Sequence, residues 1–318
     1  MKVIVDAFGG DNAPISVLEG CALAVCELGV EVVCTGAENV LRRIAKNRNI
    51  SLQGIEIATA ESVISFNDPP TDIRKKHSNC SMAVGLRLLR DGAGDVFVSA
   101  GSTGALVVGS SLIVGRKPEI KRPAIATPVP STEGSFALID AGANCDCKAE
   151  MLEQFAVMGC EFMRKAYQLE NPRVGLLNIG SEPIKGTKLL QSVFEVLEVD
   201  PEINFVGNIE PTAALCGACD VLVSDGFSGN IFLKSVEATS SFIMAELKKT
   251  FTASTLNKLA ALKLKGSLGD LQERLNPSNL GGALLAGLNK PVLKAHGNSN
   301  EMAIKNTIAQ GIKMIGSI

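Results

Sequence analysis

Tryptophan is absent from the sequence, tyrosine occurs once, and only two of the 318 residues are histidine. The hydrophobic fraction of 46% consists mainly of Ala, Val, Leu and Ile, which is typical of buried parallel strands that helices cover. The formal net charge is only −2, so we expect no nucleic acid among the main partners. The length allows one large α/β domain or two small ones.

Metal-binding patterns are scarce as well. A zinc site usually takes four ligands, often as two cysteine pairs, and only Cys145-x-Cys147 and Cys216-x-x-Cys219 approach that spacing. No export signal precedes the strand-like segment 2–6, so we expect the nine cysteines to be reduced core residues. We predict neither a metal nor another cofactor.

A membrane span is not expected, although residues 96–115 carry no charge and are long enough for one. Gly101, Gly104, Gly109 and Gly115 interrupt this segment, and serine or threonine fills several other positions. A buried strand, a glycine-rich turn and a buried helix explain it better.

Short β-rich runs alternate with amphipathic stretches along the chain. This alternation predicts a mostly parallel sheet with helices on both faces, a three-layer α/β/α arrangement in a single domain over residues 1–318. The expected strands are 3–6, 31–34, 96–99, 136–140, 173–178, 204–207 and 221–224. The clearest expected helices are 14–28, 71–90, 149–168 and 185–197.

Five of the expected strands end in small and polar residues. Ligands of open α/β sheets bind at the carboxyl edge of the strands, so we expect the five ends to share one edge and to form a binding crevice there. The candidate phosphate- or substrate-binding residues from these ends are Asp6, Gly9, Gly10, Asp11, Ser102, Thr103, Gly104, Asn144 and Asp225.

The loop 102–104 resembles a phosphate site, because its hydroxyls and free backbone N–H groups precede a helix-like stretch. Neither the Gly-Lys-Ser/Thr ending of a Walker loop nor a dinucleotide fingerprint occurs. Lys185 could reach a phosphate or could simply be a solvated lysine. Asn230 could donate to an oxyanion or could only cap a helix. His296 is a further candidate, whereas His77 is expected on an exposed helix face.

Residues 252–278 predict a protruding amphipathic hairpin of two short helices hinged at Gly266. Leu256 and Leu259 share one helical face, and Leu268 and Leu271 share another. The pair could pack on the body or on a second subunit. Alternatively, the leucines could contact a membrane surface, which two such tips in a dimer would strengthen.

Seven ordered motifs resemble those of one family, the PlsX phosphate acyltransferases of bacterial phospholipid synthesis. They are VDAFGGD (5–11), SAGSTG (99–104), DAGAN (140–144), NIGSEPIKG (178–186), FVGNIE (205–210), DGFSGN (225–230) and GGALLAG (281–287). The sequence departs from the family at Ser102, where Asn is commoner, and at Ser181, where a carboxylate is usual. Both departures lie next to the expected phosphate site.

The resemblance implies a fold like that of the isocitrate and isopropylmalate dehydrogenases and catalytic roles for Lys185 and Asn230. It implies transfer of a fatty acyl group from acyl carrier protein to inorganic phosphate, which yields acyl phosphate. A cytoplasmic homodimer peripherally bound to the inner face of the cell membrane is implied too, and a downstream membrane glycerol-3-phosphate acyltransferase is a possible partner.

In the expected mechanism, Lys185, Ser102 and Thr103 hold phosphate, Asn230 stabilises the oxyanion, Asp225 orders its loop and His296 orients one of the reactants. The acidic carrier protein could dock on any of three basic clusters, at 42–46, 74–76 or 116–122. Other interpretations are a phosphate acetyltransferase that uses coenzyme A, a catalytically silent scaffold and a dehydrogenase, the last lacking a nucleotide fingerprint.

Overall fold

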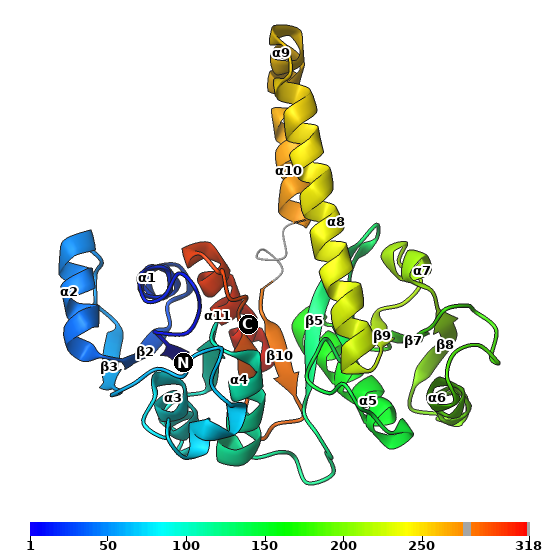
Figure 1. Ribbon diagram of the computed structural model, residues 1–318, viewed down its shortest axis with the longest axis horizontal. Coiled ribbons are helices and arrows are strands. Elements are labelled where there is room, and N and C mark those ends of the chain that lie inside the picture. The colour runs from blue at the N-terminus through cyan, green and yellow to red at the C-terminus, as the bar shows by residue number, and fades with distance from the viewer. Residues whose placement is uncertain (276–280, 317–318) are drawn as a thin grey trace.

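The computed structural model describes residues 1–275 and 281–316, and eleven strands in this part of the chain form one sheet (Figure 1). Their order is β3-β2-β1-β4-β11-β10-β5-β6-β9-β7-β8. The strands are β1 (Lys2–Asp6), β2 (Glu31–Gly36), β3 (Ile55–Thr59), β4 (Val96–Ser99), β5 (Ala124–Ser131), β6 (Gly134–Ile139), β7 (Arg173–Leu177), β8 (Asn204–Ile209), β9 (Val221–Val223), β10 (Ala283–Ala286) and β11 (Val292–Lys294).

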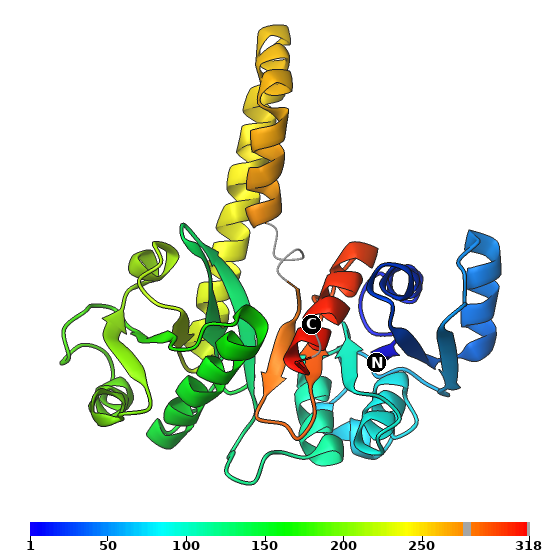
Figure 2. The same cartoon turned by 180° about the vertical axis from the view of Figure 1, so that it is seen from behind.

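Helices cover both faces of this sheet (Figures 1 and 2). The helices, of which α9 and α10 lie away from the sheet (Figure 1), are α1 (Ile15–Leu28), α2 (Glu38–Arg48), the short η1 (Pro70–Arg74), α3 (Ser81–Arg90), α4 (Thr103–Gly109), the π-helical η2 (Ser110–Val114), α5 (Ala149–Tyr167), α6 (Lys188–Val199), α7 (Pro211–Leu215), α8 (Gly226–Thr252), α9 (Thr255–Lys263), α10 (Lys265–Leu275) and α11 (Glu301–Met314).

The alternation of side chains along the buried strands produces two cores. Val3 and Val5 of β1 pack into one core with α1, α5, α6 and α11, whereas Ile4 between them packs into the other with α3, α4 and α8. Because successive side chains of a strand point to opposite faces, a strand that is apolar throughout must be covered on both sides. The apolar runs in the sequence therefore account for the layers.

The strand directions differ from the expectation that five strand ends share one edge. Strands β1 and β4 are parallel to β11, but β10 is antiparallel to both β11 and β5, and β5 is antiparallel to β6. Strands β6, β9 and β7 therefore run opposite to β1 and β4. The two sets of carboxyl ends nevertheless approach the middle of the sheet, because β4 and β6 both end beside the central strands β11, β10 and β5.

Helix α8 is 27 residues long and projects away from the sheet, and α9 and α10 return along it (Figures 1 and 2). The protruding hairpin thus consists of the outer part of α8 against α9 and α10, rather than two short helices against each other. The chain breaks at Leu264, the C-cap of α9, and not at Gly266, which lies inside α10. Residues 276–278 of the predicted hairpin and the side chain of Leu259 lie outside the described part.

The predicted helix 71–90 is wrong in its first half. Only η1 and α3 are helical there, and the chain between them turns because the Asp72 carbonyl accepts from the backbone N–H of both Lys75 and His77. This turn brings His77 inward, so its side chain is 13% exposed, with Nε2 3.4 Å from Asp68 Oδ2. The expectation of an exposed His77 is therefore wrong.

The cysteines are only partly core residues. All nine are free, and Cys21, Cys34, Cys80, Cys160 and Cys219 are buried, but Cys26, Cys145 and Cys216 are exposed. Among the described residues, no helix combines the length and the apolar character that crossing a membrane requires.

Candidate active site

A cavity of about 380 Å³ lies near the middle of the sheet. On one side is the half that contains β1, β4 and β11, and on the other the half that contains β6, β9 and β7. One half contributes Thr103 at the start of α4, and Lys294 and His296 at and beyond the end of β11. The central strand β5 contributes Thr127, and α8 contributes the side chains of Asn230 and Lys234. The cavity therefore combines two ammonium groups, an imidazole, hydroxyls, an amide and the carboxylate of Glu237.

Lys294 provides a half-buried cation in the cavity wall. Strand β11 pairs with β4 so that Lys294 lies beside Ser99, and its ammonium donates to the carbonyl oxygens of Ala100, at 3.3 Å, and Ala295. Within the described residues, no carboxylate lies at ion-pair distance from it. Burial, followed by repulsion from the Lys234 ammonium, lowers the pKa of Lys294 to about 8, against weaker opposing effects of Asp11 and Asp6.

Lys234 and His296 are in contact in the cavity wall. The Nζ atom of Lys234 lies 3.3 Å from Nε2 of His296 and 2.7 Å from a carboxylate oxygen of Glu237. Positions 230, 234 and 237 share one face of α8, since residues four and seven apart align on a helix, and all three line the cavity. The side of α8 that lines the cavity is thus mainly polar at this point, whereas Phe232 packs into the core.

Asn230 is held by the loop that follows β6. Its amide nitrogen donates to the Ala141 carbonyl at 3.0 Å, which leaves the second N–H of the amide for another acceptor. Gly142 lies directly below with φ of 136°, and a Cβ there would approach the Asn230 amide nitrogen to 2.8 Å. Only glycine fits this position, on both conformation and space.

Asp140 organises the same loop from below. Its buried carboxylate accepts the backbone N–H groups of Ile125, Gly142, Ala143 and Asn144 at 2.7–3.1 Å. Burial nonetheless raises the pKa of Asp140, because desolvation outweighs these bonds. The amide nitrogen of Asn144 is also used, since it donates to Asp140 and to the Pro123 carbonyl. Asn144 therefore orders the loop and does not line the cavity.

The loop after β1 has a similar supporting arrangement. Asp6 is buried, accepts from Ser99 Oγ at 2.7 Å, and has a pKa that desolvation raises. A Cβ at Gly9 would come within 2.6 Å of the Asp6 carboxylate, and Gly10 has φ of 105°. The backbone N–H of Asp11 donates to the Gly297 carbonyl at 2.7 Å, so this loop holds the segment that carries His296.

The start of each nearby helix has its own cap. Ser102 Oγ accepts from the Ala105 N–H at 3.4 Å, and Gly104 packs against Pro70. Asp225 is the N-cap of α8, because its carboxylate accepts from the N–H groups of Phe227 and Ser228. Asn230 lies one turn further on and is not the cap, so the capping interpretation of Asn230 is wrong.

Lys185 lies apart from this cavity. It is exposed in the loop after β7, with Nζ 3.7 Å from Glu182 Oε1. That loop is fastened from inside, since Asn208 donates to the Glu182 carbonyl and Asn178 to the Lys185 carbonyl. The structure therefore places the lysine of the family motif at the surface, beyond the residues that line the cavity.

Three predicted site residues line the cavity together, namely Thr103, Asn230 and His296. The other predicted residues support the surrounding loops or, like Lys185, lie outside. Sequence reasoning missed Lys234 and Lys294, although signals for both were available. Lys234 lies one helical turn after Asn230, and Lys294 ends a strand two residues before His296.

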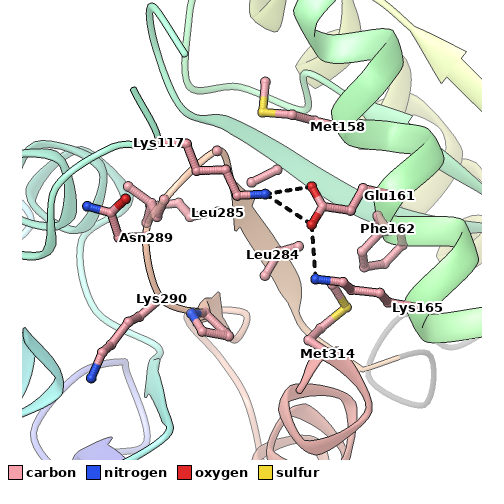
Figure 3. A pocket seen from close by; sticks show the side chains of 14 residues that line it. Lys117, Met158, Glu161, Phe162, Lys165, Leu284, Leu285, Asn289, Lys290 and Met314 are labelled. Carbon is pink, nitrogen blue, oxygen red and sulfur yellow. Dashed lines mark hydrogen bonds and ion pairs between the residues drawn. The ribbon is translucent and has the colours of Figure 1, made fainter. Parts of the chain in front are cut away.

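A second, smaller cavity of about 110 Å³ lies between α5 and the turn that joins β10 to β11 (Figure 3). Glu161 of α5 accepts from both Lys117 and Lys165 there, at 2.8–3.0 Å. Burial opposes ionisation of Glu161, but the hydrogen bonds and the charges of these two lysines outweigh it and lower the pKa of Glu161. Three lysines and one carboxylate thus line this cavity, and two of the lysines are paired with that carboxylate, whereas among the described residues no carboxylate lies at ion-pair distance from Lys294.

The chain is similar to known proteins over almost its whole length. A family model described as "Fatty acid synthesis protein" matches residues 1–317. A curated phosphate acyltransferase of Oceanobacillus iheyensis is 43% identical over 317 residues, which cover 99% of this chain and 94% of that protein. Another, from Clostridioides difficile, is 40% identical over 314 residues, covering 98% of this chain and 92% of that protein.

Solved structures of lower identity share the fold. A phosphotransacetylase from Streptococcus pyogenes superposes with a TM-score of 0.68 at 19% identity, over 100% of this chain and 94% of that one. A 4-hydroxythreonine-4-phosphate dehydrogenase from Klebsiella pneumoniae has a TM-score of 0.55 at 12% identity, over 99% of both chains. The predicted α/β fold with a large, mostly parallel sheet is confirmed.

Proposed function

Because the chain belongs to the family of PlsX-type phosphate acyltransferases, enzymes of fatty acid and phospholipid synthesis, we propose that it transfers a fatty acyl group from acyl carrier protein to inorganic phosphate. The products are acyl phosphate and free carrier protein. The observation that supports this reaction most directly is the cavity itself, where cations suited to phosphate lie beside an amide donor suited to a carbonyl oxygen.

The reaction depends more on positioning the two substrates than on activating phosphate as a nucleophile. A phosphate oxygen attacks the thioester carbonyl, the new C–O bond forms, the C–S bond breaks, and the carrier thiol leaves with the proton that phosphate gives up. Holding the two reactants in line can supply about 7–11 kcal/mol. The free N–H of Asn230 donates to the developing oxyanion, a contribution of about 3 kcal/mol.

The catalytic assignment of Lys185 remains a proposal from its motif. Lys185 is exposed near Glu182 and lies outside the cavity. Its ammonium can therefore reach the acyl donor or phosphate only when a bound substrate extends from this loop to the cavity. Ser102 and Asp225 contribute as caps that fix Thr103 and α8. The loops that contain Asp6, Gly9, Gly10 and Asn144 hold the surrounding segments in place.

Of the three basic clusters, residues 74–76 are the best candidate for the carrier protein. Arg74, Lys75 and Lys76 are exposed, with no ion pair among the described residues. Their loop adjoins the cavity, because Phe66 lines it and Pro70 packs on Gly104. The cluster at 42–46 lies on α2, at the far edge of the sheet (Figure 1), and Lys117 and Lys121 are paired with carboxylates of α5.

The protruding hairpin supports a peripheral association with the inner face of the cytoplasmic membrane. Leu256 and Leu262 of α9 are 78% and 68% exposed near its tip, and Lys258 and Lys263 are exposed alongside. Leu268 and Leu271 on α10 are less exposed and face cavities against α8. We further propose a homodimer, which presents two such tips, and transfer of the product to a membrane glycerol-3-phosphate acyltransferase.

The decisive experiment measures acyl phosphate from palmitoyl–acyl carrier protein and phosphate, beside palmitoyl– and acetyl–coenzyme A. Product from the carrier-protein donor that falls in Lys185→Ala and Asn230→Ala supports the proposal. Product from acetyl–coenzyme A alone would move the assignment to a phosphate acetyltransferase. Binding of carrier protein without product from any donor would favour a scaffold.

A further inference from the structure

We infer that Lys294, together with Lys234, His296 and Thr103, forms the subsite that binds the phosphate substrate inside the central cavity. The inference rests on the proposed function and deepens it, since it assigns the binding of phosphate, the acyl acceptor, to residues outside the motif that contains Lys185. Its basis is the convergence of two ammonium groups on one cavity whose charge is incompletely neutralised.

Lys294 is poorly placed for a purely structural role. A half-buried lysine usually forms an ion pair or extends its ammonium to solvent, yet in the described part of the chain the Lys294 ammonium bonds only to the neutral carbonyls of Ala100 and Ala295. Desolvating a cation beside a second cation is unfavourable. A group that the fold maintains at such a cost is expected to have a function, and the missing partner is an anion.

The geometry of the neighbours favours a small anion with several oxygens. Lys234 extends from α8, and its Nζ atom lies 2.7 Å from a carboxylate oxygen of Glu237 and 3.3 Å from Nε2 of His296. Thr103 lines the same cavity with a hydroxyl that can donate or accept. Each of the four side chains can donate a hydrogen bond to a phosphate oxygen, and the negative charge of phosphate relieves the repulsion between the two lysines.

The position also fits the reaction. Asn230 lies one helical turn before Lys234 on α8, and both side chains line the cavity. Phosphate bound between Lys234 and Lys294 therefore lies next to the proposed oxyanion donor. By contrast, the ammonium of Lys185 is exposed, and Lys185 does not line the cavity that contains Asn230.

The test compares four variants of the full-length enzyme: Lys294→Met, Lys234→Met, Lys185→Met and the control Lys290→Met. Lys290 precedes β11 by two residues and also donates to a backbone carbonyl, that of Leu89 at 2.9 Å, but it lines the smaller cavity (Figure 3). Steady-state kinetics give the KM for phosphate and for acyl carrier protein separately. Calorimetric titration with inorganic phosphate gives binding without a donor.

We expect Lys294→Met to raise the phosphate KM at least about tenfold, as loss of a hydrogen bond to a charged group predicts, with the carrier-protein KM little changed. Lys234→Met should act in the same direction, Lys290→Met should match the wild type, and Lys294→Arg should recover part of the phosphate binding. Unchanged phosphate KM and binding in Lys294→Met, with both lost in Lys185→Met, would overturn the inference and place the acceptor at the exposed loop.

Two outcomes separate this inference from the proposed function. If the wild type makes no acyl phosphate but binds phosphate, and Lys294→Met abolishes that binding, the subsite stands and the reaction fails. If acyl phosphate forms, but Lys294→Met and Lys234→Met change neither the phosphate KM nor the calorimetric binding of phosphate, the reaction is supported and the subsite is refuted. Should Lys294→Met not fold, Lys294→Gln and Lys234→Met decide by the same two measurements.

Discussion

Replacing Lys294 by methionine should make the protein more stable near neutral pH while it removes the phosphate-binding charge. The pKa of Lys294 lies at about 8 rather than the usual 10.5. At ~1.4 kcal/mol per pKa unit, this difference means that the charged side chain costs the folded state about 3 kcal/mol. Methionine keeps the aliphatic stem but leaves the Ala100 and Ala295 carbonyls without their donor, at a loss of about 1–2 kcal/mol.

The net gain of Lys294→Met at pH 7 is therefore about 1–2 kcal/mol, or about 2–3 °C in Tm for a chain of this size. The dependence on pH has a defined sign. Between pH 8 and 10.5 the unfolded chain binds more protons at this lysine than the folded one, so the stability of the wild type rises with pH across that window. The variant lacks this rise, and its advantage should disappear by about pH 10.

Urea unfolding of both proteins at pH 7.0, 8.5 and 9.5 checks the prediction, with Lys290→Met as the control for loss of a lysine. The reasoning is refuted if Lys294→Met is less stable than the wild type at pH 7 and the difference between them does not change with pH. Phosphate must be absent from the buffers, because a bound anion would stabilise the wild type selectively.

Four further predictions concern other parts of the molecule. Gly229→Ala would place a Cβ 2.1 Å from the Asp140 carbonyl oxygen, and should cost more than about 3 kcal/mol in urea unfolding. Asn230→Ala should lower kcat about 10²–10³-fold, with little change in the phosphate KM. Lys76→Glu should raise the KM for carrier protein at low salt, a difference that shrinks at high salt because exposed charges are screened. Leu256→Asp should reduce flotation with anionic lipid vesicles while leaving turnover of carrier-bound palmitate unchanged, and unaltered flotation would remove the membrane role of the tip.

The elements of the sheet could be predicted better than their directions. Buried strands such as β1 and β4 are continuous apolar runs, and this pattern reports burial on both faces. The pattern carries no information on which way a strand runs. The reversal depends on β5, β6 and β10, whose antiparallel pairing joins the halves, and β10 and β11 come from the far end of the chain. Long-range pairing of this kind is not encoded in local periodicity.

Sequence patterns point to some of the site residues and not to others. Thr103 is a candidate because its loop follows the predicted strand that ends at Ser99, and His296 because glycine and polar residues surround it in the sequence. Asp6 and Asn144 look the same in the sequence, but their side chains turn inward to Ser99 and Asp140. Lys294 escaped notice because a lysine is usually solvated, although its place two residues before His296 was a signal, and the three-dimensional packing shows that its ammonium is partly buried.

The reversal of strand direction also explains why this fold suits a reaction between two substrates. Had all the strands been parallel, their loops would form one row along a single edge. Here the half that contains β4 and β11 carries Thr103, Lys294 and His296, and the half that contains β6 carries the loop that holds Asn230. Each half can therefore hold one reactant, phosphate on the first and the thioester carbonyl on the second. Helix α8 begins at the second half and brings Lys234 across to His296, so it sets the distance between the two reactants.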